Sequence, residues 1–151
     1  MPISLSRARN IIRKALAKGR EMDLKPLSVV VLDEGGHVMA FERENGAAPG
    51  RFAIAQGKAY GAVMLGMPGS AQMARAEAQG YFMAAVNGVY GGQVVPVPGG
   101  VLIRDGRGKV LGAVGVIIAF VISLTLVPAL VTRGKTSAAT AARVPASDAV
   151  A

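Results

Sequence analysis

The chain has 151 residues, no cysteine, one histidine and a formal net charge of +8. This length fits one domain, the absence of cysteine excludes disulfides, thiolate nucleophiles and cysteine metal sites, and the single histidine excludes a multi-histidine metal site within one chain. Because the positive charge is concentrated in residues 1–25 and 133–151, whereas residues 26–132 hold seven basic against six acidic residues, we expect no nucleic-acid binding.

An amphipathic helix is the first predicted element, over residues 4–22. Its apolar residues recur at helical spacing from Leu5 through Ile12 to Leu16, and most of its arginines and lysines lie elsewhere on the helical wheel. The basic face is either solvated or attached to an anionic membrane or polymer, and ordinary charge patterns favour the solvated face. The same basic residues interrupt any apolar leader segment, so we expect no secretory signal and a cytoplasmic location.

Two strands joined by a tight turn follow this helix, which we expect to end at Lys25-Pro26. Residues 27–33 form a nearly continuous apolar run, which is typical of a strand covered on both faces, and residues 37–44 form the second strand. Between them, residues 33–36 have the sequence Asp-Glu-Gly-Gly, whose members tolerate positive φ. The sequence therefore predicts a hairpin, with the only histidine, His37, directly after its turn.

Two helices are predicted next, over residues 51–65 and 71–86. The first carries a stripe of small side chains that suits close packing on a sheet, and Gly57 and Gly61 within it would let another backbone approach. Ser70 is the expected N-cap of the second helix.

The segment 93–118 returns to strand chemistry, in QVVPVP, in VLIRD and in KVLGAVGVII. We expect a turn at residues 106–108, and we place Pro96 and Pro98 at an edge or a strand entrance because proline donates no ladder hydrogen bond. The order of helix, hairpin, two helices and a second hairpin predicts an α+β fold in which helices cover a central antiparallel sheet.

Three stretches carry a family resemblance: VVVLDEGGHVMAFERENGA, IAQGKAYGAVMLGMPGSAQMA and VPVPGGVLIRDGRGKVLGAVGV. In this order, and over about residues 4–116, the chain resembles the GlcG/HbpS-like family of haem-binding or haem-degrading proteins, which is related to the C-terminal domain of PduO-type proteins. The resemblance implies a profilin-like α-β-α sandwich, a homo-oligomer and binding of haem or a related tetrapyrrole. The Glu-x-x-Glu pattern that some members use for iron is absent, because Glu42 and Glu44 are two residues apart.

Basic side chains around the loop at residues 45–51 are the strongest candidates for a binding site. Arg43, Arg51 and Lys58 could hold carboxylates, such as haem propionates or a small organic acid, and helical spacing puts Arg51 and Lys58 on one face. The alternative is that these side chains form surface or interface salt bridges. His37 could be a haem or metal ligand or a general base, although an exposed hairpin position is the more common role of such a histidine. These four residues are the predicted cofactor-binding set.

We therefore expect a haem- or tetrapyrrole-binding protein with a role in haem handling or degradation. One alternative is an isomerase or lyase acting on a small oxo- or hydroxy-acid, with Lys58 or His37 as acid or base and Arg51 as carboxylate clamp. Another is a non-catalytic oligomeric accessory protein. Tyr60 and Tyr81 could stack on a ligand but are expected in the core. The methionines considered as axial ligands, and expected instead to fill gaps, are Met64, Met67, Met73 and Met83.

The carboxyl-terminal segment departs from the family pattern. The stretch from Val110 to Thr132 has no charge and is long enough to cross a hydrocarbon core of about 30 Å. Because its first residues belong to the last strand and Pro128 interrupts the rest, a buried or interface segment is favoured over membrane association through residues 118–132. A frameshift or fusion is the third interpretation. The chain is thus expected to consist of a domain at residues 1–118, an apolar segment at 119–133 and a disordered tail at 134–151.

Overall fold

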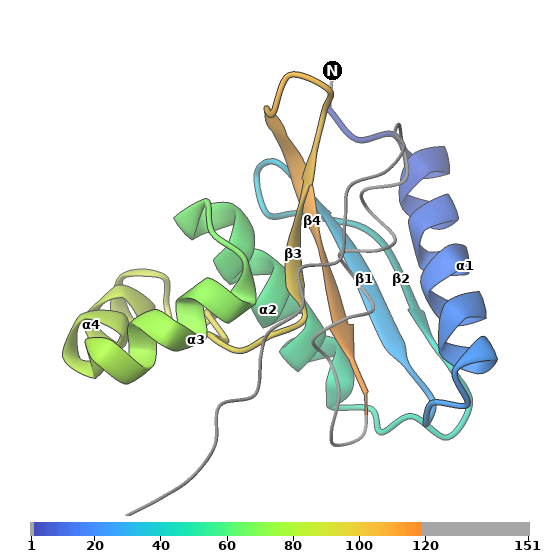
Figure 1. Ribbon diagram of the computed structural model, residues 1–151, viewed down its shortest axis with the longest axis horizontal. Helices are drawn as coiled ribbons and strands as arrows, with labels where there is room; N and C mark the ends of the chain where they lie inside the picture. The colour runs from blue at the N-terminus through green and yellow to red at the C-terminus, as the bar shows by residue number, and fades with distance from the viewer. Residues whose placement is uncertain (1, 119–151) are drawn as a thin grey trace, which may run out of the picture.

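Four helices and four strands make up the part of the chain that the computed structural model describes, residues 2–118. The elements are α1 (Leu5–Glu21), β1 (Ser28–Asp33), β2 (Val38–Arg43), α2 (Arg51–Leu65), α3 (Gly69–Ala78), α4 (Gly80–Val89), β3 (Gly100–Arg104) and β4 (Val110–Ile117). The strands form one sheet in the order β2-β1-β4-β3, and every neighbouring pair is antiparallel. This architecture confirms the predicted α+β fold (Figure 1).

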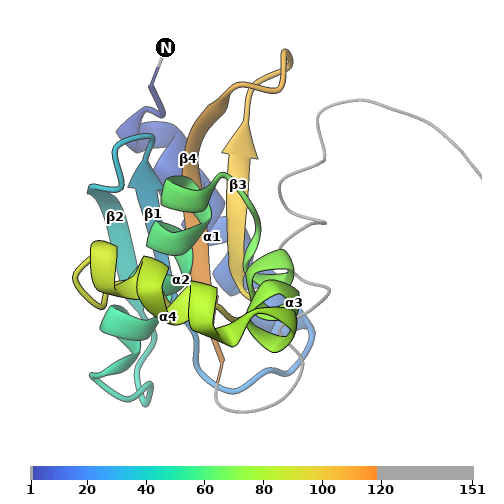
Figure 2. The ribbon, with the colours of Figure 1, turned by 90° about the vertical axis from the view of Figure 1, so that its left-hand side faces the viewer.

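The sheet lies between helices on its two faces. α2 packs against β4, β1 and β3 on one face, whereas α1 packs against β2 and β1 on the other, which makes an α-β-α sandwich (Figures 1 and 2). α3 contacts α2 and β3, and α4 packs on α3 and extends away from the sheet. β1 is a central strand whose side chains alternate between Val29 and Val31 on the α1 side and Val30 and Leu32 on the α2 side. Its unbroken apolar sequence follows from this burial on both faces.

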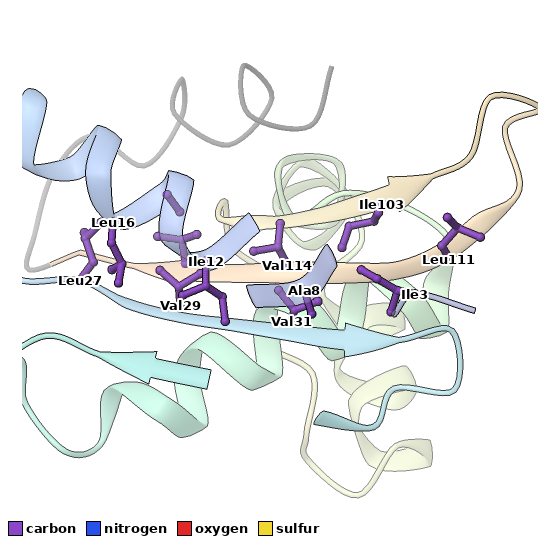
Figure 3. Close-up of a cluster of buried hydrophobic side chains, with 12 residues drawn as sticks. Ile3, Ala8, Ile12, Leu16, Leu27, Val29, Val31, Ile103, Leu111 and Val114 are labelled. Carbon is purple, nitrogen blue, oxygen red and sulfur yellow. The ribbon is translucent and has the colours of Figure 1, made fainter. Parts of the chain in front are cut away.

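The core under α1 joins residues from distant parts of the chain. Ala8, Ile12 and Leu16 of α1 face the side chains of β1 and β4 in one cluster (Figure 3). Leu5, which helical spacing puts in the same stripe, is instead 44% exposed and lines a cavity beside Arg9. The predicted stripe is therefore confirmed for its central residues and wrong for its first.

α1 ends at Glu21, which agrees with the predicted helix over residues 4–22, and it ends four residues before Lys25-Pro26, the predicted stop signal. Asp23 turns the chain with a φ of 52°, and the Leu24 N–H donates to the carbonyl of Gly19 at 2.9 Å. Such bonds satisfy the last carbonyls of a helix, so the helix is closed before the proline is reached.

The predicted hairpin is confirmed. The Asp33 N–H donates to the His37 carbonyl at 2.9 Å, and the Gly36 N–H donates to the Asp33 carbonyl at 3.1 Å. Gly36 has a φ of 83°, a conformation that favours glycine. β1 and β2 pair from Ser28 opposite Arg43 to Leu32 opposite Val38, with a bulge near the turn.

The second predicted helix, residues 71–86, is in fact two helices. α3 ends at Ala78, Gln79 leaves helical geometry with φ −141° and ψ 60°, and α4 starts at the next residue. The next residue, Gly80, is a weak helix former, so interrupting the helix at this point costs little free energy. Ser70 is not the N-cap either, because α3 already begins at Gly69 and Pro68 holds the N-cap position.

Residues 93–98 do not form the strand that their sequence suggests. The Val95 N–H donates to the carbonyl of Gly57 in α2 at 3.2 Å, so this segment crosses α2 and does not extend the sheet. An added Cβ on Gly57 would lie 2.8 Å from the Gln93 carbonyl oxygen, which confirms the predicted close backbone approach. Gly61, by contrast, packs against the side chains of Gln72 and Val94.

The last strand of the sheet contains the first part of the uncharged carboxyl-terminal stretch. β4 takes the first eight residues of the uncharged stretch and ends at Ile117. Within residues 2–118, no helix has the length and apolar character needed to cross a membrane. The predicted apolar segment 119–133 and tail 134–151 lie outside the described residues.

Glu44 ties together the ends of α1, β1 and β2. Its carboxylate accepts from the Leu27 N–H at 2.8 Å and from Arg20 Nε at 2.9 Å. Because Leu27 is fully buried, we expect Glu44→Ala to lower the free energy of unfolding by about 1.5 kcal/mol, since the Leu27 N–H loses its charged acceptor. Urea denaturation measures this. The control is Glu42→Ala at an exposed position, and equal losses for the two variants would contradict the role of Glu44.

Candidate functional site

A groove runs between α1 and the edge strand β2. Two adjoining cavities of about 650 Å³ and about 520 Å³ share Leu16, Arg20 and Glu42 and together make up this concavity. It is called here the arginine groove, and the residues that define it are Leu5, Arg9, Arg13, Leu16, Arg20, Leu24, Glu42, Arg43 and Glu44.

The arginine groove combines apolar side chains with guanidinium groups. Arg9 and Arg13 lie one helical turn apart on α1, and within residues 2–118 neither forms an ion pair with a carboxylate. Arg20 is paired with Glu44, and Arg13 donates to Asn10 at 3.1 Å. Guanidinium groups bind carboxylates in a bidentate way, so the groove can accept a ligand that has both an apolar body and acidic groups.

The prediction from the sequence favours a solvated basic face on α1, and it does not include this groove. Arg9, Arg13 and Arg20 recur at spacings that place them on one side of the helix, and this is the signal that could have marked them. The sequence does not reveal that β2 lies next to these arginines and places Glu42 and Arg43 beside them.

His37 is an exposed hairpin residue, 82% exposed in its side chain. Its Nδ1 lies 3.3 Å from the Asp33 carboxylate, and it lines none of the cavities described for residues 2–118. Partial burial raises the pKa of Asp33, but the N–H groups of His37 and Gly35 donate to its carboxylate and bring that pKa below its usual value. The turn therefore fixes His37 beside a stabilised carboxylate.

Arg43 and Arg51 stabilise the loop that joins β2 to α2. Arg43 Nη1 donates to the Ala47 carbonyl at 3.0 Å, and Arg51 Nη1 donates to the Pro26 carbonyl at 2.7 Å. Each guanidinium has five N–H donors, so these bonds leave others free. Only Arg43 of the two lines the arginine groove.

Lys58 is buried between α2 and the sheet, with 6% of its surface exposed. Its Nζ donates to the Val116 carbonyl at 3.4 Å, and no carboxylate pairs with it in the described part of the chain. Burial lowers the pKa of Lys58, because a charged ammonium loses hydration there. The four predicted site residues therefore do not form one site. Only Arg43 lines the arginine groove, whereas His37 is in the hairpin, and Arg51 and Lys58 are on α2.

The two candidate tyrosines have different environments. Tyr60 is half-buried and lines a pocket of about 330 Å³ between α2 and residues 92–95, with Tyr90 at 6.0 Å between ring centroids. Tyr81 is 79% exposed on α4, so its expected place in the core is wrong.

Of the candidate methionines, Met83 is buried, as expected for a gap-filler. Residues 2–118 contain no group of three or more His, Asp or Glu side chains placed to hold a metal ion.

The sequence matches one family model over nearly all of the described part. The model is that of haem degrading protein HbpS-like, and it covers residues 3–117. A comparison with curated proteins gave no match.

Solved structures share this fold. A crystal structure of a PduOC:heme complex superposes with a TM-score of 0.75 at 18% identity, over 87% of this chain and 94% of that one. The crystal structure of HbpS gives 0.71 at 22% identity, over 87% and 86% of the two chains. The Klebsiella pneumoniae protein ORFY gives 0.70 at 20% identity, over 85% of each. At these identities the likeness establishes the α+β fold and nothing more specific.

Proposed function

Because this chain belongs to the HbpS-like family of haem degrading proteins, we propose that it binds haem in the arginine groove. The observation that carries the proposal is that leucine and arginine side chains line the same concavity there. Haem has a flat apolar ring and two propionates, so it needs both kinds of surface in one place. The larger cavity, about 650 Å³, also falls within the roughly 300 to 1,000 Å³ of ordinary ligand sites.

Different residues of the groove would contact the haem ring and the haem propionates. The exposed Leu5 and the half-buried Leu24 offer apolar surface to the ring. Arg9 and Arg13, which have no carboxylate partner in residues 2–118, offer donors to the propionates. Haem iron is usually held by His, Cys, Met or Tyr, and none of these lines the groove. Haem would supply iron and a conjugated ring, and the chain would bind the ring and its propionates.

A haemin titration of the wild-type chain and of His37→Ala tests this proposal, read from the Soret band. We expect a saturable change at one haem per subunit in the wild type and the same affinity in His37→Ala. If His37→Ala abolishes the change, His37 is the iron ligand and the groove assignment fails. If the wild type shows no saturable change, haem binding fails, and a non-catalytic accessory role is favoured.

We also propose that α4 is a contact surface between copies of this chain. Tyr81 and Val89 are 79% and 80% exposed, although large apolar side chains on a helix are normally covered. Among the helices of residues 2–118, α4 alone has no charged residue. In a chain with a net charge of +8, a second copy meets the least like-charge repulsion at this helix.

Substitution of Tyr81 and Val89 by lysine tests this contact. We expect the double variant to dissociate at concentrations where the wild type is oligomeric, because two ammonium groups would face their copies. Light scattering after size exclusion measures the mass. Met22→Lys combined with Val38→Lys, at two other exposed apolar positions, adds the same two charges outside α4 and should keep the oligomer. A monomeric wild type, or a double variant of unchanged mass, would overturn the proposal.

A further inference from the structure

Three polar side chains lie near the end of the sheet where β1 begins and β4 ends. Arg51 reaches the carbonyl of Pro26, just before β1, and Lys58 reaches the carbonyl of Val116, near the end of β4. Ser28 pairs with Ile117, the neighbour of Val116. Arg51, Lys58 and Ser28 are called here the polar cluster, and none of the three lines the arginine groove.

Two members of this cluster are buried without adequate partners. Ser28 is fully buried, and its hydroxyl has no hydrogen-bond partner in the described part of the chain. Lys58 has only the long 3.4 Å bond to a carbonyl, where a buried ammonium normally pairs with a carboxylate. Unpaired buried polar groups are costly, and each one in a native structure calls for an explanation, such as a catalytic role or a bound water or ion.

Desolvation also changes the chemistry of the amine. Burial lowers the pKa of Lys58, which increases its neutral, nucleophilic fraction compared with an exposed lysine. Buried lysines are used in this way to form imines with carbonyl compounds. Lys58 is only 6% exposed, but Arg51, Ile117 and Pro98 at this end of the sheet are half-buried, so only a small molecule can reach the amine from the surface.

The separation of the two basic groups defines the reactant further. Pro26 precedes by three residues the β1 residue that pairs with Val116, so the two carbonyls that hold Arg51 and Lys58 are on the order of 10 Å apart by strand geometry. A molecule that meets both groups therefore needs its carbonyl and its carboxylate at opposite ends of a short carbon chain.

We propose that Lys58 condenses with short ω-oxo acids such as 4-oxobutanoate, whose carboxylate is bound by Arg51. The neutral amine attacks the aldehyde carbon, a proton passes from nitrogen to the former carbonyl oxygen, and the resulting carbinolamine loses water to leave an imine. No electrons are transferred and no other reactant is needed. Arg51 contributes its free N–H donors to the carboxylate while one remains on Pro26.

Reductive trapping on the full chain tests this inference. The protein is incubated at pH 7 with cyanoborohydride and either 4-oxobutanoate or butanal, which has the aldehyde but no carboxylate, and adducts are mapped by peptide mass spectrometry. We expect 4-oxobutanoate to label Lys58 several-fold more than the exposed Lys14, and butanal to lack most of this preference. Lys58→Arg should lose the adduct at that position.

The role of Arg51 has its own control. Arg51→Gln should lower labelling of Lys58 by 4-oxobutanoate about tenfold, the value of one charge-assisted hydrogen bond, and leave labelling by butanal unchanged. An equal loss of Lys58 labelling with both aldehydes would mean that Arg51 has only a structural role, and it would contradict the proposed binding of the carboxylate by Arg51. If this variant fails to fold, the ratio of the two labels at Lys58 in the wild type decides alone. Labelling of Lys58 no stronger than that of Lys14 overturns the proposal, whatever the haemin titration gives.

Discussion

Gly115→Ala is expected to lower the free energy of unfolding by about 3 kcal/mol or more. Gly115 lies in β4 directly beneath α2, and an added Cβ would collide with the carbonyl oxygen of Ala55 and lie 3.1 Å from the Cβ of Ala59. The collision is with helix backbone, so no side-chain rotation relieves it, and α2 must lift from the sheet. This is the upper end of the cost of overpacking a core, because α2 covers three strands.

Thermal unfolding followed by circular dichroism measures this loss, which corresponds to a decrease in Tm of roughly 10 °C or more. Gly106→Ala is the matched control, because Gly106 lies in the β3–β4 turn and an added Cβ meets nothing there. Its effect should stay within about 0.5 kcal/mol. Similar losses for the two variants would show that α2 does not rest on β4 at Gly115.

Replacing Arg9 and Arg13 together by alanine is expected to weaken haem binding about 30-fold. The two guanidinium groups lie on the groove side of α1 and have no carboxylate partner in residues 2–118, so they are available to propionates. An ion pair at a partly exposed site contributes about 1 kcal/mol, and two such pairs give about 2 kcal/mol. The haemin titration measures the change in Kd, and added salt should reduce the difference between the variant and the wild type.

Arg7→Ala combined with Lys14→Ala is the matched control for charge. Both residues are exposed on α1, outside the residues that line the groove, so the control removes the same charge from the same helix. We expect it to change Kd by less than about threefold, through long-range attraction alone. Equal weakening by the two double variants would mean that α1 attracts haem by net charge and does not hold its propionates.

Local sequence patterns predicted most of the elements, because their physical causes are local. The alternation of side chains in β1, the turn glycine Gly36 and the stripe around Ile12 each act within a few residues. The errors have a different cause. Residues 93–98 have strand chemistry, but their hydrogen bonds go to α2, and Tyr81 is exposed because α4 extends away from the sheet.

The candidate sites show the same division between local and long-range causes. Sequence spacing correctly placed Arg51 and Lys58 on one helix, but it could not reveal that each reaches a different strand carbonyl. His37 was placed correctly in the hairpin, and the structure puts it away from every described cavity. A residue's type suggests its chemistry, whereas its partners depend on segments far away along the chain.

By itself, the sequence determined the family, the hairpin, the amphipathic helix and the absence of cysteine chemistry, because composition, periodicity and motif order are properties of short stretches. Only the tertiary structure decided that Arg9 and Arg13 of α1 share a groove with Arg43 of β2, and that Ser28, Arg51 and Lys58 lie near the same end of the sheet. These groups are brought together when α1 and α2 bury their apolar faces on opposite sides of the sheet, and that packing is a property of the whole chain.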